Sequence, residues 1–328
     1  MNRMLGLWAA AGVLLGFLAV GRSPAGAEGV PVLPEKCYLF TSFRGNGEDG
    51  LHLAWSTDGL KWTALNGDRS YLRPEVGKEK LIRDPCLLQG PDGTFYMVWT
   101  DSWTDRTIGY AHSRDLIHWS PQKALPVMQH EPMARNCWAP EIVYDAKKHQ
   151  FLIFWATTIP GRFPATENSA EDNYNHRIYC TTTKDFEAFT PTRLFYDGGF
   201  NVIDATLLRT GKQYYLFLKD ETLKPVTRKH LRIARSPQLE GPYTELSEPF
   251  TPSWVEGPTA LKVGSDYFVY YDEYRKHAYG AVRSKDLKSW EDVSSQLFLP
   301  RGTRHGTALP VSRNVLRHLL SATPERGR

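Results

Sequence analysis

One short motif recurs along the 328 residues of this chain and constrains the fold more than any other feature. It is Ser/Thr-x-Asp with an aromatic residue four positions after the aspartate, and a fifth, degenerate copy begins at Ser236. A period of this size is typical of a four-stranded β-propeller blade with loop insertions. The closing aromatic residues lie 47–70 residues apart, at Trp62, Trp119, Phe189, Tyr243 and Trp290.

A dense run of aromatic and β-branched residues precedes each copy and predicts a buried strand. Near-continuous apolar runs suit strands that are covered on both faces, as stacked blades require. Helical spacing is limited to about one turn within 314–320. The five runs are residues 38–40, 95–99, 151–155, 214–218 and 267–271.

A third element, a strand with a polar or aromatic residue at its start, precedes four of the five copies, with heads at Asp84, Trp138, Asp204 and Glu256. The first copy lacks this strand, and a spare one that contains His305 follows the last copy. We therefore predict an all-β fold, a five-bladed β-propeller whose ring is closed by pairing of the N- and C-terminal strands. A β-sandwich with accidental repeats is the alternative fold.

The first 27 residues are typical of a signal peptide: a short basic start, an uncharged apolar run over 5–20 and a small-residue cleavage pattern at 25–27. We predict a mature chain of 28–328 that forms a single catalytic domain and is secreted or periplasmic. An uncleaved membrane anchor is the alternative for this segment.

The formal net charge is +4, and it falls to +2 without Arg3 and Arg22. No basic stripe is present, so nucleic acid is not expected as a partner. No later segment is apolar enough to span a membrane, and we expect a monomer. The 10 Trp, 16 Tyr and 15 Phe suit both a core and stacking on sugars. The four cysteines lie in strand-like runs and are expected to be buried free thiols, with one bridge left open; they are Cys37, Cys86, Cys137 and Cys180.

Three of the strand heads are acidic, which suggests catalysis. Inner strands line the channel of a propeller, so Asp84, Asp204 and Glu256, at corresponding places in three repeats, are expected to converge at one end of it. Like charges in a partly dry site raise at least one pKa, and glycoside hydrolysis uses such a pair of a neutral acid and an ionised carboxylate. An isolated strand-head acid would more often be a turn former. The motif acids recur with the turn and are therefore expected to be structural: Asp58, Asp115, Asp185 and Asp286.

From about Tyr38 to Leu309 the chain resembles glycoside hydrolase family 43, five-bladed propeller enzymes that act on arabinose-, xylose- and galactose-containing polysaccharides. The matching motifs are Arg-Asp-Pro at 83–85, Trp-Ala-Pro-Glu at 138–141, Ile-Asp-Ala at 203–205 and Glu-Gly-Pro at 256–258. The resemblance implies that Asp84 is the general base, Glu256 the general acid and Asp204 the residue that orients the acid, with inversion of configuration. It also places His305 on the axis, where many members bind calcium or a water cluster. We expect no required cofactor, and a structural calcium near His305 is left open. The split blade ahead of Asp84 is a departure, since many relatives have the base close to the mature N-terminus.

Two other functions have features that can be compared with this sequence. A fructan hydrolase would need an Asn-Asp-Pro-Asn nucleophile before Asp84, and a non-catalytic sugar-binding propeller would be expected to lack one of the acids. The histidines show no spacing typical of metal ligands, so no metal site is predicted. The insertion at 159–177 is expected to border the channel and influence substrate choice. The sequence predicts a carbohydrate substrate, arabinofuranosides first, then xylosides and galactans, bound with the help of Trp103, Trp138, Asn201 and His305. Packing between blades is the alternative role of Trp103.

Overall fold

Each of the five dense apolar runs forms the second strand of its own sheet in the computed structural model, which describes residues 33–322. These strands are β1 (Lys36–Ser42), β5 (Phe95–Thr100), β9 (Gln150–Thr158), β13 (Gln213–Asp220) and β16 (Asp266–Glu273). Most of their side chains are buried on both faces, which explains why they show no polar-apolar alternation.

The five sheets are consecutive along the chain, and four of them have four strands. The inner strands are β4 (Arg83–Gln89), β8 (Trp138–Asp145), β12 (Val202–Thr210), β15 (Glu256–Val263) and β19 (Ala308–Ser312). The third and fourth strands are β2 (His52–Ser56) with β3 (Thr63–Ala64), β6 (Ile108–Ser113) with β7 (Lys123–Leu125), β10 (His176–Thr183) with β11 (Arg193–Tyr196), β14 (His230–Ser236) alone, and β17 (Ala278–Ser284) with β18 (Glu291–Asp292).

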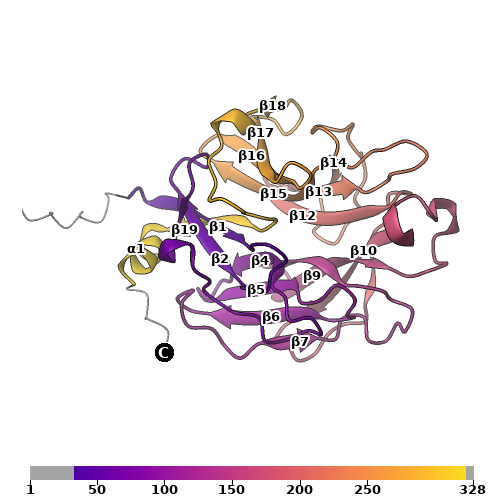
Figure 1. Ribbon diagram of the computed structural model, residues 1–328, viewed down its shortest axis with the longest axis horizontal. Helices are drawn as coiled ribbons and strands as arrows, with labels where there is room; N and C mark the ends of the chain where they lie inside the picture. The colour runs from indigo at the N-terminus through magenta and orange to yellow at the C-terminus, as the bar shows by residue number, and fades with distance from the viewer. Residues whose placement is uncertain (1–32, 323–328) are drawn as a thin grey trace, which may run out of the picture. The chain divides into compact units, whose positions relative to one another are not determined.

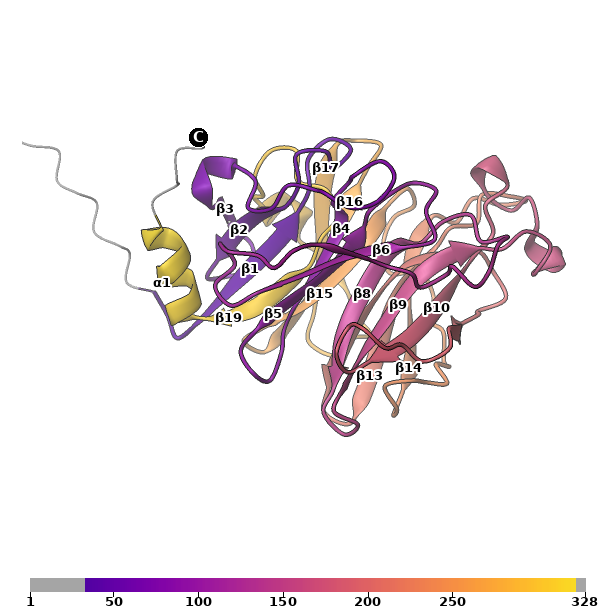
Figure 2. The same ribbon diagram turned by 90° about the horizontal axis from the view of Figure 1, so that it is seen from below.

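The two ends of the described chain meet in one sheet. Strand β19 pairs antiparallel with β1, with Leu39 opposite Leu309, and the Thr41 amide donates to the Thr307 carbonyl at 2.9 Å. Contacts between neighbouring sheets run from β4 through β8, β12 and β15 to β19 and return to β4 through β1. Figures 1 and 2 show β19, in yellow, beside the indigo β1. The predicted five-bladed propeller and its terminal pairing are therefore confirmed.

The recurring motif makes the turn that follows the third strand, as predicted. In the first copy the Asp58 carboxylate accepts from the amides of Leu60 and Lys61, both at 2.8 Å, and the Ser56 hydroxyl accepts from Gly59. The residue after each aspartate has a positive φ, 75° at Gly59 and 65° at Leu116. These bonds satisfy the backbone of the turn, so the acids are structural. The same pattern of bonds is present around Asp115, Asp185 and Asp286.

The remaining features qualify three smaller expectations. The four cysteines are buried and free, so the one bridge left open does not form. Helix α1 (Arg313–Ser321) is longer than the single turn expected at 314–320, because Leu316 and Leu319 pack on the core. Within residues 33–322 no helix is long and apolar enough to cross a membrane. The predicted signal peptide lies outside the described residues, so it stays a prediction, as does the domain start at residue 28.

Candidate active site

One β-bulge, repeated in four inner strands, shapes the strand heads. In β4, β8, β12 and β15 three residues span the distance that two residues span on the partner strand. The second residue of each bulge has a positive φ: 50° at Asp84, 46° at Ala139, 51° at Asp204 and 57° at Gly257. Bulges of this kind re-aim side chains near functional sites. Here they turn the heads of four strands toward the channel axis.

The bulge also corrects the expected equivalence of the three acids. Asp84 and Asp204 occupy the same bulge position, whereas Glu256 lies one residue earlier, at the position of Arg83 in β4 and Trp138 in β8. In sequence, Glu-Gly-Pro and Arg-Asp-Pro look interchangeable because the proline follows in both. The one-residue offset gives Glu256 neighbours that differ from those of the two aspartates.

Asp84 is held by two neighbours. Its Oδ2 accepts from the Thr100 hydroxyl at 2.8 Å, and its Oδ1 lies 3.3 Å from His305 Nδ1. Only 12% of the side chain is exposed. Burial opposes its ionisation, but the hydrogen bond and charge of His305, followed by Arg83 and Thr100, lower the pKa of Asp84 to about 2. Asp84 is therefore a carboxylate at any ordinary pH.

Asp204 has the opposite balance. Its Oδ2 accepts from the Gly257 amide at 3.0 Å, and 8% of the residue is exposed. Burial raises the pKa of Asp204, the charges of His305 and Lys219 oppose the rise, and the nearby Glu256 and Asp84 add to it. The Gly257 bond ties Asp204 to the residue that follows Glu256, so these two acids from adjacent sheets are linked through one peptide.

Glu256 lies between two cations. Lys219 Nζ is 3.2 Å from its Oε2, and Arg304 Nη2 is 3.3 Å from its Oε1. Lys219 itself is 1% exposed and also contacts Glu221 at 2.7 Å. Neither cation was among the predicted site residues. The only signal in the sequence is that Lys219 directly follows the apolar run 214–218 and that Arg304 precedes His305.

His305 is central to the site. Burial would lower its pKa, but the bond to Asp84 and the charges of Asp84, Asp204 and Glu141 raise the pKa of His305 to about 9. Its ring packs on Gly257, where an added Cβ would lie 2.4 Å from His305 Cγ. The described structure thus brings together Asp84, Asp204, Glu256 and His305, four of the seven predicted site residues.

Glu141 in β8 is a further acid in this cluster. It belongs to the Trp-Ala-Pro-Glu motif but was not among the predicted site residues. Its Oε2 accepts from the Thr206 hydroxyl at 2.9 Å, and its charge acts on His305. Burial raises the pKa of Glu141 to about 7. Because Glu141 lies just beyond the bulge of β8, the alternation of a strand around that bulge could have identified it as an inward-facing residue.

The three predicted polar and aromatic contacts form a separate group at the head of β8. Trp138 donates from Nε1 to the Trp103 carbonyl at 3.0 Å, and the two rings meet edge to face with centroids 5.6 Å apart. Trp103 is 39% exposed, and Arg83 lies 4.2 Å from its ring centroid. Asn201 is fully buried and bonds the His176 amide and the Tyr174 carbonyl. In this conformation Asn201 therefore positions the chain beside Trp138, and its contact with a sugar stays a prediction.

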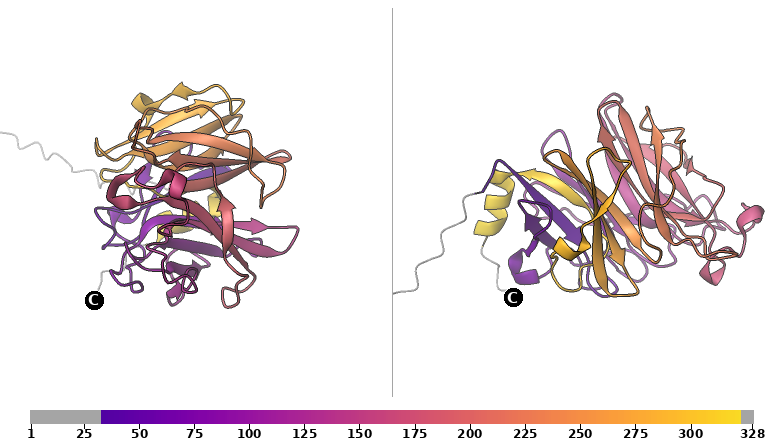
Figure 3. Two further views of the ribbon diagram at one scale, coloured as in Figure 1. Left: turned by 90° about the vertical axis from the view of Figure 1, so that its right-hand side faces the viewer. Right: turned by 90° about the horizontal axis from the view of Figure 1, so that it is seen from above.

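The insertion at 159–177 reaches this aromatic group. It includes the short 3-10 helices η2 (Pro164–Thr166) and η3 (Glu171–Asn173), which project beyond the ends of β8, β9 and β10 (Figure 2). Its Tyr174 packs on Trp138 with centroids 4.7 Å apart, and buried Arg177 anchors it through Asn175 and Thr166. Within residues 33–322, helix α1 and the two 3-10 helices lie at opposite ends of the propeller (Figure 3).

The residues around His305 do not fit a calcium site made of side chains. Among the described residues no group of three or more His, Cys, Asp or Glu side chains is arranged to hold a metal ion. His305 Nδ1 is engaged by Asp84, so this ring nitrogen is already occupied by a partner. No step proposed below uses a metal.

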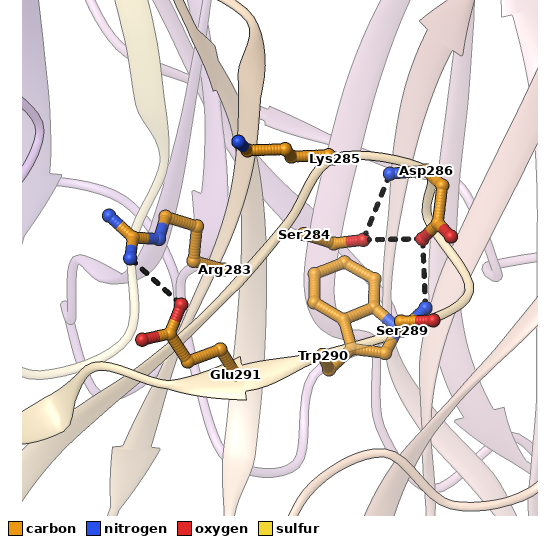
Figure 4. A pocket seen from close by; sticks show the side chains of 7 residues that line it. All are labelled: Arg283, Ser284, Lys285, Asp286, Ser289, Trp290 and Glu291. Carbon is orange, nitrogen blue, oxygen red and sulfur yellow. Dashed lines mark hydrogen bonds and ion pairs between the residues drawn. The ribbon is translucent and has the colours of Figure 1, made fainter.

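A pocket of about 410 Å³ lies beside Trp290, away from the acids. Figure 4 shows that it lies around the turn motif, with the Ser284 hydroxyl and the Asp286 carboxylate bonded to each other and to backbone amides. A pocket of about 290 Å³ with the equivalent residues Thr183, Asp185 and Phe189 lies at the turn of the third sheet. Because this hollow recurs with the motif, it is a feature of the blade and no specific site.

Comparison with known proteins identifies the family. Residues 34–316 match the family described as a probable glycosyl hydrolase domain related to family 43. An α-L-arabinofuranosidase of Bifidobacterium longum subsp. longum is 24% identical over 284 residues, which are 73% of this chain and 26% of that protein. The chain thus spans about a quarter of the length of this relative.

Solved structures share the fold. The α-L-arabinofuranosidase from Lactobacillus brevis aligns with a TM-score of 0.51 at 17% identity, over 65% of this chain and 72% of that chain. The GH43_1 enzyme from Xanthomonas citri, solved with xylotriose, aligns with a TM-score of 0.51 at 13% identity, over 67% and 75%. Since the family match extends over most of the sequence, this chain belongs to the glycosyl hydrolase domains related to glycoside hydrolase family 43.

Proposed function

We propose that this protein is an inverting glycoside hydrolase that acts on plant-type polysaccharides or oligosaccharides, with α-L-arabinofuranosides as its first substrates. β-Xylosides and galactans or galactofuranosides are the next candidates. The observation that carries the proposal is the convergence of Asp84, Asp204 and Glu256, from three different sheets, around the single residue His305.

In the proposed reaction Asp84 accepts a proton from a water molecule as the water oxygen attacks the anomeric carbon. The glycosidic C–O bond breaks, its electron pair stays on the leaving oxygen, and Glu256 supplies the proton which that oxygen takes up. The lowered pKa of Asp84 keeps this residue ionised, as a base requires. Asp204, bonded to the Gly257 amide, orients the backbone next to Glu256.

The blade order supports inversion. Asp84 and Glu256 lie on β4 and β15, which are separated by β8 and β12 in one direction and by the sheet of β19 and β1 in the other. Carboxyl groups on non-adjacent blades leave room for a water molecule, and inverting enzymes need a separation of roughly 6.5–9.5 Å. We also propose that the first 27 residues direct export and that the protein acts as a monomer.

A panel of 4-nitrophenyl glycosides tests the substrate, with α-L-arabinofuranoside, β-D-xyloside, β-D-galactoside and galactofuranoside side by side. Proton NMR of the first-formed sugar then tests the stereochemistry. Release of the opposite anomer is expected. Release of the same anomer would mean a covalent intermediate and would overturn the assignment of Asp84 as a base, and inactivity on the whole panel and on arabinan, xylan and galactan would leave a sugar-binding propeller.

A further inference from the structure

A second aromatic group lies on the Glu256 side of the site. Trp254 precedes Glu256 by two positions, and its ring meets that of Tyr274 edge to face with centroids 6.5 Å apart. Tyr274 in turn lies under Lys219, whose Nζ is 4.9 Å from the ring centroid and contacts Glu256. Both aromatic side chains are partly exposed. This group is therefore connected to the proposed acid and separate from the Trp103 and Trp138 rings beside Asp84.

Two cationic side chains contact Trp254, and they differ in their exposure and in their ion pairs. Lys229 is 1% exposed, lies 5.8 Å from the ring centroid and is paired with the carboxylates of Glu221 and Glu171. Arg275 is exposed, and its Cζ lies 3.1 Å from the ring centroid. Within residues 33–322, Trp254 is the one partner that Arg275 has, since no carboxylate lies within 4 Å of its guanidinium.

We propose that Trp254 and Tyr274 form the subsite for the leaving-group sugar, and that Arg275 makes this subsite selective for a sugar with a carboxylate, a uronic acid. The inference rests on the proposed function, because an acid at Glu256 places the leaving oxygen, and the sugar attached to it, on this side.

The chemistry of Arg275 favours an acidic sugar. A neutral sugar that stacks on Trp254 must displace the guanidinium and lose its cation–π contact. A uronic acid can contact the aromatic group and pair its carboxylate with the planar guanidinium, which binds carboxylates in a bidentate manner. The Glu221 and Glu171 carboxylates are already paired with Lys229, so they oppose such an anion less than free acids would.

The test compares a disaccharide whose reducing-end unit is a uronic acid with the same disaccharide after reduction of the carboxylate to an alcohol. The glycone is the sugar that the aryl glycoside panel identifies. The expected kcat/KM is about two- to fivefold higher for the acidic disaccharide, the range for an exposed charge pair, and the preference should fall in 0.5 M NaCl. Arg275→Met should remove the preference, and Trp254→Ala should lower kcat/KM for both disaccharides while aryl glycosides with good leaving groups are affected least.

Arg209→Met is the matched control, since Arg209 also stacks on an aromatic ring, Tyr214, but at the opposite end of β12. Equal loss on acidic and neutral disaccharides in Arg275→Met would overturn the selectivity, and a Trp254→Ala enzyme with unchanged kcat/KM on both would overturn the subsite. If the protein cleaves no aryl glycoside, the proposed function fails separately. Calorimetric titration of free glucuronic and galacturonic acid against wild type and Arg275→Met then decides on the subsite, and equal or undetectable binding would refute it.

Discussion

The site has a base side around the proposed base Asp84 and an acid side around the proposed acid Glu256. Both residues lie on the same type of β-bulge, in β4 and in β15, yet their electrostatic surroundings differ. On the base side, Asp84 has one cationic partner, His305, and a hydroxyl, Thr100. On the acid side, Glu256 has Lys219 and Arg304, and Lys219 continues the chain of charges to Glu221. A shift of one residue along the bulge is enough to exchange the first set of neighbours for the second. Similar motifs in different blades can thus acquire different chemical roles without any change in the backbone.

The largest effect is expected for Asp84→Asn, which removes the proposed base. Turnover of every substrate should fall by roughly 10²–10⁴-fold, whatever the leaving group, because the carboxylate that is proposed to activate water is lost. The measurement is kcat/KM on an activated and an unactivated glycoside. Asp266→Asn is the control and should retain activity, because Asp266 lies opposite Val263, at the other end of β15 from Glu256. An Asp84→Asn enzyme that loses activity only on poor leaving groups would place the acid there instead.

An effect limited to substrates with poor leaving groups is expected for Glu256→Gln, which alters the proposed acid. Natural linkages need protonation of the leaving oxygen, so kcat/KM on them should fall by roughly 10²–10⁴-fold, whereas dinitrophenyl glycosides should be nearly spared. The ratio of the two substrate classes is therefore the measurement. If Asp84→Asn and Glu256→Gln give the same ratio, the two sides do not have the roles assigned to them.

The junction between the two sides is expected to be sensitive to size. Gly257→Ala should displace His305 from Asp84, because the added Cβ would lie 2.4 Å from His305 Cγ, and it should reduce both activity and stability, the latter by about 2–4 kcal/mol. Backbone strain alone does not explain this, since Asp84 and Asp204 adopt the same positive φ. Gly264→Ala is the matched control: its φ is +60° with nothing within 4 Å, so about 1 kcal/mol is expected in urea unfolding. Equal losses in the two variants would contradict the packing argument.

The sequence predicted the blades, the closure and the convergence of Asp84, Asp204 and Glu256 because these depend on short-range patterns, while the catalytic roles of the three acids stay a prediction. Five apolar runs, a repeated turn and a spare head strand determine the topology without knowledge of side-chain contacts. The offset of Glu256 could not be predicted, since a bulge changes register without changing the local residue pattern. Lys219 and Glu141 were missed for a related reason. Their importance arises from contacts between sheets, with Glu256 and with Thr206, which are 37 and 65 residues away in the chain.

The smallest effect concerns His305, whose charge belongs to the base side. The folded protein keeps His305 protonated up to about pH 9, whereas the unfolded chain releases that proton near pH 6.5. The stabilisation is therefore fully present below pH 6.5 and is lost as the pH rises through about 9. Between pH 7 and 9 the free energy of unfolding should fall by about 2 kcal/mol in total.

Urea unfolding at pH 7, 8 and 9 measures this slope, and His305→Gln isolates it, because glutamine can still donate a hydrogen bond to Asp84 but cannot titrate. The groups with pKa values raised to about 6 or 7 have lost nearly all of their protons by pH 8 in the folded state, so the segment from pH 8 to 9 reports on His305 most directly; these groups are Asp101, Asp204, Asp272 and Glu141. In His305→Gln the free energy of unfolding should not change between pH 8 and 9. A wild-type slope that persists in His305→Gln would show that the base-side charge is not on this ring, and that Asp84 owes its low pKa to Arg83 and Thr100 instead.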